Sequence, residues 1–330
     1  MRYTIHMNSF WKNKKVLVTG GAGFIGSHVV EKLIGMGANV RILDRISDGK
    51  LKYIEYLKKD IEIIRGECAD PATALTACTS MDVVMNLAAH VGGIEYNRTH
   101  QATMLHDNSE IALSMIEAAR KADVERFLVV SSACVYPHDA IVPTPESEGT
   151  RGEPEPTNSG YGWAKRYAEL LGKLYAEEYN MKVGIVRPYN AYGPRDHFSP
   201  ESSHVIPALI ARVASGENPV VVWGSGKQTR AFLYVEDFAD GLIQSIEQYP
   251  VPDPVNIGTD EEISIGDLVK MIITISGKKS DIQFDTTKPD GSPKRNSDNS
   301  KVKEKVGFCA KISLKEGLQK TIEWYSNQHI

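Results

Sequence analysis

The sequence predicts an α/β protein, in which a doubly wound parallel sheet with helices on both faces is joined to a smaller C-terminal lobe. Short runs of β-branched residues alternate with longer helical patterns over residues 1–188, as is typical of strand–helix–strand units. A glycine-rich turn joins the first strand to the first helix. Gly, Pro, Ser and His become frequent after Pro188, which indicates a differently built, loop-rich region. A chain of 330 residues is long enough for both parts.

The first half contains six runs that favour strands. These runs span residues 15–20, 38–44, 61–70, 81–89, 126–132 and 182–188. Helices are predicted between them at 24–37, 108–124 and 161–179. In the second of these helices, apolar residues recur near the spacing of one helical face, at Ile111, Met115, Ile116 and Ala119.

The second half reads as a lobe that the chain enters more than once. Residues 204–216 form a helical pattern and 219–224 a strand, whereas 230–248 and 254–258 look like returns to the sheet. The expected division is a sheet domain of residues 1–188 plus about 231–260, and a lobe of about 189–230 plus 261–330.

The composition narrows the class of protein. Lys+Arg 38 against Asp+Glu 42 gives a net charge of −4, which gives no reason to expect nucleic acid or an anionic membrane as a partner. Four widely spaced cysteines without a CxxC pair argue against a disulfide framework or a metal site. Residues 1–15 lack the apolar core of a signal peptide, and no run of about 18 apolar residues occurs. We therefore expect a cytoplasmic protein without a metal.

The turn TGGAGFIG follows the first strand and opens the first helix. Glycines at this spacing permit a tight turn and let backbone N–H groups approach a pyrophosphate at the helix N-terminus. An ordinary strand–helix turn is the simpler interpretation, but here both the strand and the helix are predicted. The pattern predicts a Rossmann-type dinucleotide site contacted by Gly20, Gly23, Phe24, Ile25 and Gly26.

Asp44 ends the second predicted strand. A carboxylate there accepts hydrogen bonds from the adenosine ribose and repels a 2′-phosphate, which favours NAD over NADP. The adjacent Arg45 argues in the other direction. Asp70, at the end of GECAD, is either an adenine contact or an exposed loop carboxylate.

Tyr161 and Lys165 form a Y-x-x-x-K pair at the start of a predicted helix, where residues four apart share a face. A phenol titrates near pH 10 in water and is a poor base at neutral pH. A neighbouring ammonium and a bound nicotinium would both favour the phenolate, which makes Tyr161 a usable acid or base. Taken alone, the pair reads as a chance arrangement on an exposed helix. Ser132, which ends the preceding strand, changes this interpretation because its hydroxyl can bond the same reacting oxygen.

These residues, with the segments NLAA (86–89) and RPYNAYGP (187–194), resemble the extended short-chain dehydrogenase/reductase family over essentially the whole chain. The resemblance implies a catalytic triad of Ser132, Tyr161 and Lys165, and hydride transfer between a sugar carbon and NAD(P). It also implies cofactor contacts in and around the triad. These contacts are Leu87, Ala88, Ala89, Asn108 (as a structural support), Tyr161 and Lys165.

Cys134 stands where many 4-epimerases of this family carry threonine, and no carboxylate follows Ser132, as dehydration would require. A cysteine here is similar to the GDP-mannose 3,5-epimerase and GDP-fucose synthase groups. The resemblance implies that Cys134 is a catalytic base and that His204 is its partner acid. Core packing for Cys134 and a polar loop for His204 are the alternatives. The chemistry is consistent, because a ketone at carbon 4 acidifies carbons 3 and 5.

The same resemblance places substrate contacts in the C-terminal lobe. The expected contacts are Gly92, Gly93, Asn190, His204, Val205, Arg212, Trp223, Arg230 and Arg295. Guanidinium groups suit a diphosphate, although arginines are also common on solvated surfaces. Trp223 reads equally well as a nucleotide contact and as a core residue.

The sequence thus predicts an NAD-dependent nucleotide-sugar epimerase that forms a homodimer and acts on a GDP-hexose rather than a UDP-sugar. It would oxidise carbon 4 transiently while Cys134 and His204 exchange protons at carbon 3 and/or 5. A fucose-synthase-type epimerase/reductase and a UDP-hexose 4-epimerase remain as alternatives. A catalytically inactive nucleotide sensor is disfavoured because Tyr161 and Lys165 are both present.

Overall fold

The computed structural model describes residues 10–46, 51–199, 203–288 and 292–328. Residues 1–9, Ser202 and residues 289–291, which belong to segments discussed above, lie outside the described residues.

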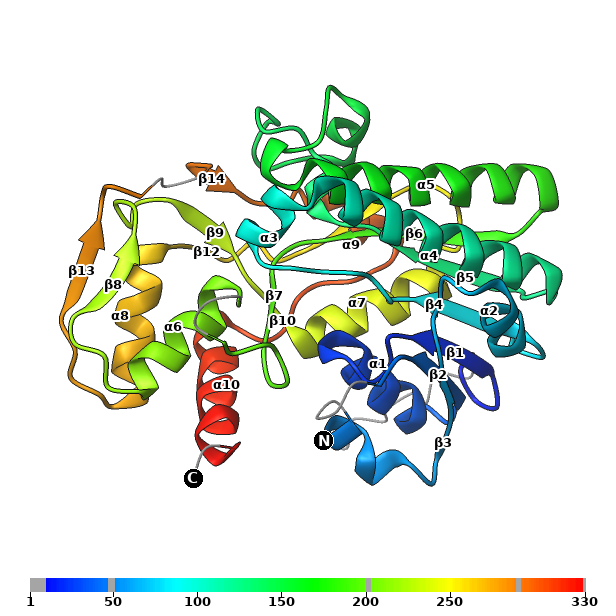
Figure 1. Cartoon of the computed structure of the whole chain (residues 1–330), viewed down its shortest axis with the longest axis horizontal. Coiled ribbons are helices and arrows are strands. Elements are labelled where there is room, and N and C mark those ends of the chain that lie inside the picture. Colours follow the sequence, from blue (N-terminus) through cyan, green and yellow to red (C-terminus); the bar gives the residue numbers. More distant parts are fainter. Residues whose placement is uncertain (1–9, 47–50, 200–202, 289–291, 329–330) are drawn as a thin grey trace.

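A seven-stranded parallel sheet forms the larger domain (Figure 1). Its strands follow the order β11-β6-β5-β4-β1-β2-β3, and every neighbouring pair is parallel. The strands are β1 (Lys15–Thr19), β2 (Asn39–Asp44), β3 (Ile61–Arg65), β4 (Val83–Asn86), β5 (Arg126–Val130), β6 (Lys182–Pro188) and β11 (Val255–Ile257). The predicted doubly wound fold class is confirmed.

Helices cover both faces of this sheet. They are α1 (Phe24–Gly35), α2 (Pro71–Cys78), α3 (Ile94–Thr99), α4 (Gln101–Lys121), α5 (Ser159–Tyr179) and α7 (Val235–Gln248). Leu33 of α1 and Phe238 of α7 belong to one buried cluster, whereas Cys78 of α2, Met115 of α4 and Ala168 of α5 belong to another. Figure 1 shows α4 and α5 side by side on one face, with α1 and α7 on the other. Each face therefore buries its own apolar layer.

The order of the strands reverses between β1 and β4. From β1 the chain winds outwards through β2 and β3, then returns to place β4 on the other side of β1. Loops that leave the carboxyl ends of β1 and β4 diverge at this point and leave a crevice, which is where ligands bind in sheets of this type. The predicted glycine turn follows β1, so the topology puts it at the crevice.

The smaller lobe has its own buried cluster, to which Leu209, Val222 and Leu268 belong. It contains α6 (Val205–Ala214), β8 (Val220–Trp223), β9 (Thr229–Ala231), β12 (Glu262–Ser264), α8 (Ile265–Ser276), β13 (Ile282–Asp285), β14 (Lys294–Arg295) and α10 (Leu314–Gln328). The strands form two small sheets, β12-β9-β14 and β13-β8. A short parallel pair, β7 (Ala191–Tyr192) with β10 (Leu233–Tyr234), lies where the chain passes between the domains.

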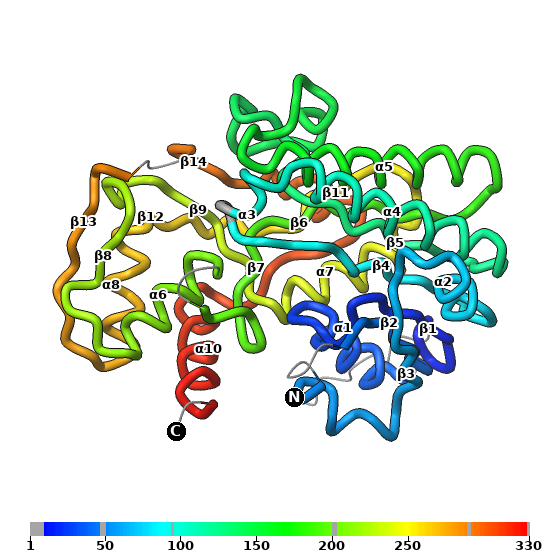
Figure 2. The backbone as a smooth tube through the Cα atoms, in the orientation of Figure 1, coloured from blue at the N-terminus to red at the C-terminus, as the bar shows by residue number. Residues whose placement is uncertain are grey.

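The C-terminal part of the chain returns to the larger domain once more than the sequence predicted. Val302 of α9 (Ser300–Lys305), together with Val306 and Phe308, belongs to the buried cluster of α1 and α7. Figure 2 shows the chain running from β14 towards β11 and then returning to α10. The expected assignment of all residues after 261 to the lobe is therefore wrong for this segment, because its apolar side chains complete the core of the larger domain.

Two helix boundaries also differ from the prediction. The run 61–70, predicted as one strand, ends at Arg65, and Asp70 and Pro71 then start α2 as its cap and first residue; both are ordinary helix-start signals. Helix α4 begins at Gln101 rather than Asn108. The sequence pattern did not indicate these first turns because they are polar, and only Met104 marks their buried side. None of the helices in the described ranges is both long enough and apolar enough to span a membrane.

Candidate active site

The glycine turn after β1 forms a cradle that side chains would fill. Gly20 has φ +66°, a left-handed conformation, and a Cβ added to it would lie 3.2 Å from the Cα of Ala88. A Cβ on Gly26 would lie 2.1 Å from the carbonyl oxygen of Gly20. Gly23 is the N-cap of α1 and offers no side chain to the N–H groups of the first turn. This open helix N-terminus, which includes Phe24 and Ile25, fits a pyrophosphate.

Asp44 lies at the end of β2, beside this cradle. Its carboxylate accepts hydrogen bonds from the N–H groups of Ala22 (3.0 Å) and Ile46 (2.9 Å). A carboxylate can accept about four hydrogen bonds, so capacity remains for ribose hydroxyls. Arg45 is exposed and lies 3.9 Å from Glu67. Asp70 caps α2 by accepting from the N–H of Thr73 at 2.9 Å, a structural role that the sequence-based adenine assignment did not anticipate.

The loop after β4 closes the other side of the crevice. Thr19 donates a hydrogen bond to Asn86 (2.8 Å) and accepts one from the N–H of Ala88 (2.9 Å), which holds Leu87, Ala88 and Ala89 beside the glycine turn. Asn108, buried on α4, bonds both the N–H and the carbonyl of His90, each at 3.0 Å. The side chain of Asn108 thus holds the backbone of this loop, as the predicted structural support would.

Ser132, Tyr161 and Lys165 come from a strand end and one helix. Ser132 follows β5 and accepts the N–H of Cys134 at 3.1 Å, capping the short helix η3 (Ala133–Val135). Lys165 donates to the carbonyl of Val130 at 2.9 Å, and its Nζ lies 5.3 Å from the centre of the Tyr161 ring. The ammonium therefore sits between the end of β5 and the phenol.

The charge states of these side chains are set mainly by burial. Burial lowers the pKa of Lys165 to about 8, while Cys134 and Glu169 act in the opposite direction. Burial also raises the pKa of Tyr161, and Cys134 adds to that effect. In the protein alone burial therefore dominates, and the expected effect of the Lys165 ammonium together with a bound nicotinium stays a prediction.

A buried ion pair supports the segment that carries Ser132 and Cys134. Arg187 of β6 donates to both carboxylate oxygens of Glu169, at 2.8 and 2.6 Å. Glu169 also accepts the hydroxyl of Ser131 at 2.5 Å, and Arg187 reaches the Tyr136 hydroxyl at 3.3 Å. Both ends of residues 131–136 are therefore tied to one buried pair. We did not predict this pair from the sequence, although Glu169 lies one helical turn beyond Lys165.

Arg166 holds the middle of the same segment. Its guanidinium donates to the carbonyl of Val135 at 2.9 and 2.6 Å. Gly162 lies so close to this segment that a Cβ on it would be 2.5 Å from the Cys134 carbonyl. Helix α5 therefore positions both its own Tyr161 and the loop that carries Cys134.

Cys134 is half-buried and has a cationic neighbour. The Nη2 atom of Arg295 lies 3.9 Å from its Sγ atom. Although burial opposes the charge, Cys134 and Tyr189 raise the pKa of Arg295. Strand β14 carries Arg295 and pairs with β9, which sets Arg295 beside Arg230. Arg295, expected as a diphosphate contact, is thus placed against the thiol of Cys134.

His204 is the N-cap residue of α6, directly before Val205, and its side chain is 74% exposed. Its Nδ1 atom lies 3.9 Å from an oxygen of Asp196, whose side chain is only 4% exposed. The Asp196 carboxylate raises the pKa of His204. Asp196 was not predicted from the sequence, because the two residues meet only through the fold of the loop after β7.

The remaining predicted substrate contacts fall into two groups. Arg212 is engaged within the lobe, where its guanidinium forks onto Glu217 and donates to the Val221 carbonyl at 2.5 Å. It therefore pins the end of α6 to β8, and the expected diphosphate contact is not supported. Asn190 bonds the Ala231 carbonyl at 2.9 Å, which ties β7 to β9.

The second group retains accessible polar or aromatic surface. Arg230 donates to the carbonyls of Thr229 and Ser292, and burial, with the neighbouring Arg295, lowers its pKa. Trp223 is 64% exposed with the Lys288 ammonium 5.6 Å from its ring centre, so the core alternative for Trp223 is wrong. Gly93 starts α3, and Gly92 precedes it in the loop after β4.

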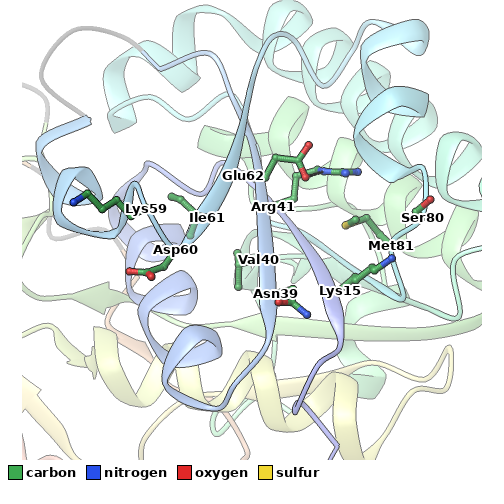
Figure 3. A pocket seen from close by; sticks show the side chains of 10 residues that line it. All are labelled: Lys15, Asn39, Val40, Arg41, Lys59, Asp60, Ile61, Glu62, Ser80 and Met81. Atoms are coloured by element: carbon green, nitrogen blue, oxygen red, sulfur yellow. Dashed lines mark hydrogen bonds and ion pairs between the residues drawn. The ribbon is translucent and has the colours of Figure 1, made fainter.

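A hollow of about 610 Å³ lies elsewhere, at the amino ends of β1, β2 and β3 (Figure 3). It is lined in part by Lys15, Asn39 and Ile61, the first residues of these strands. Arg41 on its wall is paired with Glu62 at 2.8 Å. Gly20 and Ser132 follow the carboxyl ends of their strands, whereas the hollow lies at the amino ends. The hollow is therefore not part of the candidate active site.

Comparisons with known proteins agree with this geometry. Residues 16–258 match the model of the NAD dependent epimerase/dehydratase family. The chain is 36% identical to the putative GDP-L-fucose synthase 2 of Arabidopsis thaliana over 318 residues, covering 95% of this chain and 92% of that protein. It is 30% identical to GDP-mannose 3,5-epimerase of the same organism over 334 residues, covering 98% and 86%.

A solved structure shows the same architecture over nearly the whole chain. The UDP-glucose 4-epimerase of Thermotoga maritima, with UDP-glucose, superimposes with a TM-score of 0.85 at 30% identity, covering 96% of this chain and all of that one. The glycine cradle, the Ser–Tyr–Lys constellation and these similarities lead to one conclusion: the chain is an enzyme that belongs to the NAD dependent epimerase/dehydratase family.

Proposed function

We propose that the protein is an NAD-dependent nucleotide-sugar epimerase that acts on a GDP-hexose by transient oxidation at carbon 4. Proton exchange at carbon 3 and/or carbon 5 of the resulting ketone would invert those centres. The observation that carries this proposal is the position of Cys134. Its thiol lies on the segment that carries Ser132, and the Arg295 guanidinium lies 3.9 Å away.

Tyr161 takes the proton of the carbon 4 hydroxyl, and Ser132 bonds the same oxygen. Lys165, held by the Val130 carbonyl at 2.9 Å, places a positive charge beside the phenol and favours its ionised form. The cradle of Gly20 and Gly23 would hold NAD, which would supply a reversible hydride acceptor next to carbon 4. The net reaction consumes no cofactor.

Cys134 and His204 act on the carbons next to the ketone. The carbonyl stabilises the carbanion that forms when a neighbouring C–H bond releases its proton. Thiolate is the basic form of cysteine, and in this proposal Cys134, with the Arg295 guanidinium 3.9 Å away, receives that proton. His204, whose protonated form is favoured by Asp196, delivers a proton to the opposite face, and the configuration inverts.

We infer NAD rather than NADP from Asp44. The Asp44 carboxylate is fixed by two backbone N–H groups at 3.0 and 2.9 Å, where it would oppose the negative charge of a 2′-phosphate. A GDP-sugar is favoured because relatives with GDP in their names match nearly the whole chain. Arg230 and the exposed Trp223 are the proposed contacts for its diphosphate and base.

We also propose a cytoplasmic homodimer that pairs through α4 and α5. Each of these helices exposes two large apolar side chains. The side chains are Leu105, Leu113, Leu170 and Leu174, each between 41% and 52% exposed. If they gather on one face, they would form the kind of apolar surface that marks protein contacts.

A second candidate is an epimerase/reductase of the GDP-fucose-synthase type, which would start from a 4-keto sugar and finish by reducing it. The greater identity to the fucose synthase relative, 36% against 30%, favours it. Such a net reduction draws on NADPH, against which Asp44 argues.

Incorporation of solvent deuterium tests the proposal. The purified protein is incubated in D₂O with GDP-mannose, and in parallel with UDP-glucose, without added cofactor, and products are read by NMR. We expect label at carbon 3 or 5 of the GDP-sugar. Inversion at carbon 4 without label would replace the proposal by a UDP-hexose 4-epimerase. A reaction only with NADPH and a 4-keto-6-deoxy sugar would establish the second candidate.

The role of Cys134 is tested by substitution. Cys134→Ser should abolish label uptake and leave hydride transfer to NAD intact. Cys309→Ser, which removes an exposed cysteine, is the matched control and should leave both unchanged. Label uptake that survives in Cys134→Ser would show that another group removes the proton.

A further inference from the structure

A buried carboxylate lies behind His204. The Asp196 side chain is 4% exposed, and its Oδ1 atom accepts the N–H of His197 at 2.7 Å. Its Oδ2 atom is buried and has no hydrogen-bond partner within the described parts of the chain. Buried polar atoms without a partner are rare, because desolvation is not compensated. The nearest cationic group to this oxygen is the imidazole of His204, with Nδ1 at 3.9 Å.

The position of Asp196 is fixed independently of His204. The preceding Arg195 has φ +71°, the left-handed conformation that few non-glycine residues adopt. Its guanidinium binds Glu31 of α1 at 2.6 Å, and His28 of the same helix contacts the Pro194 carbonyl at 3.1 Å. The helix that begins at the glycine cradle therefore holds the loop that carries Asp196, so the carboxylate is presented before any substrate enters.

We propose that Asp196 is the positioning residue of His204. Its Oδ2 atom accepts the Nδ1–H group, which fixes the ring tautomer, stabilises the imidazolium and leaves Nε2 to face the sugar. This role rests on the proposed function of His204 as proton donor. A separation of 3.9 Å exceeds a hydrogen bond, but a small rotation of the exposed imidazole closes it, as catalytic contacts often do when substrate binds.

Within the described ranges, which leave out residues 200–202 just before His204, Asp196 is the charged group that acts on His204. Glu31 and Arg195 form an ion pair with each other, and burial, more than Arg195, lowers the pKa of His28 to about 4, so that it is neutral near pH 7. Burial raises the pKa of Tyr53, so it is neutral as well. His197 binds Asp196 through its backbone N–H. The Asp196 carboxylate is the charge that favours the protonated form of His204.

The first test needs no substrate and does not depend on the proposed function. The full-length chain, labelled with ¹⁵N-histidine, is titrated by NMR, and the His204 signal is assigned by its loss in His204→Gln. We expect His204 to titrate above the ordinary value of about 6.5, and Asp196→Asn to lower its midpoint. Asp123→Asn, an exposed position with φ 57° that suits asparagine, is the control. A wild-type midpoint at or below the ordinary value overturns the proposal without any variant.

The second test is a double-mutant cycle on label uptake. In the wild-type background, Asp196→Asn should slow uptake at pH 8 about tenfold for each unit by which the His204 midpoint falls. Lysine is protonated at this pH without a partner, so Asp196→Asn should change uptake little in the His204→Lys background. Equal losses in both backgrounds would make Asp196 merely structural. A shifted midpoint with no label uptake in the wild type would instead overturn the proposed function and leave the pairing intact.

Discussion

The two halves of the candidate site are built differently. The hydride half, Ser132, Tyr161 and Lys165, comes from one strand end and one helix of the larger domain. The proton half, Cys134 with Arg295 and His204 with Asp196, is assembled from η3, β14, the start of α6 and the loop after β7. Contacts in the hydride half include a 2.9 Å hydrogen bond, whereas both contacts of the proton half are 3.9 Å.

This difference indicates how the two functions depend on the fold. The hydride half is complete within the sheet domain and rests on the buried pair of Glu169 and Arg187. The proton half requires the smaller lobe to be in place, because Arg295 and His204 both come from it. Proton exchange should therefore be more sensitive to changes in the lobe, and hydride transfer to changes beneath α5.

The largest effect is expected from the hydride half itself. Tyr161→Phe removes the group that carries the carbon 4 proton, so both hydride transfer and label uptake should fall about 10²- to 10⁴-fold. NADH absorbance and deuterium NMR measure the two steps. Tyr167→Phe makes the same chemical change on the same helix and should retain activity. Label uptake in Tyr161→Phe would show that exchange does not require the ketone and would separate the two halves completely.

The support beneath both halves is the next target. Arg187→Met leaves the Glu169 carboxylate buried without its ion pair, and breaking such a pair costs about 3–5 kcal/mol of the free energy of unfolding. Chemical denaturation should show this loss, with label uptake and hydride transfer declining together. Lys270→Gln removes an exposed partner of Asp267 and should change the free energy of unfolding by less than about 1 kcal/mol. Comparable losses in both variants would contradict a supporting role for Arg187.

The difference between the halves also explains what the sequence could predict. The glycine turn, Asp44 and the Y-x-x-x-K pair are local patterns, and the strand–helix alternation around them determines where they lie in the sheet. Arg295 is 161 residues from Cys134, and their contact depends on β14 pairing with β9, which no local pattern specifies.

Two predicted ligand contacts have competing partners nearby in the sequence. Arg212 is predicted to bind a diphosphate because its guanidinium has the right chemistry, but Glu217, five residues later, already occupies it. Asp70 is predicted as a possible adenine contact although Pro71 directly after it marks a helix start. In both cases the partner seen in the structure lies within five residues along the chain, and both ligand contacts stay predictions.

Arg295→Gln should affect the proton half alone. Loss of the guanidinium removes the cation that lies 3.9 Å from the Cys134 sulfur, so label uptake at pH 7 should fall at least about tenfold, the range of a single charge-assisted contact. Hydride transfer should persist, because Cys134 remains in place and the contacts of Arg295 with the described residues do not include Tyr161 or Lys165. Equal loss of hydride transfer would indicate that Arg295 chiefly binds the substrate, as the sequence predicted.

The smallest effect is expected on KM for the GDP-sugar. The sequence predicts both Arg212 and Arg230 as diphosphate contacts, and the structure distinguishes between them. Arg212 and Arg230 both lie in the lobe, but Arg212 is neutralised by Glu217, whereas Arg230 has two carbonyl partners and a second arginine beside it. Two neighbouring guanidinium groups repel unless an anion lies between them, so Arg230 is the better contact for a diphosphate. Arg230→Gln should raise KM for the GDP-sugar about tenfold, and Arg212→Gln by less than about twofold, both at unchanged fold as judged by thermal unfolding. A KM that rises more in Arg212→Gln would mean that substrate displaces Glu217, and the lobe would then rearrange around the diphosphate instead of receiving it preformed.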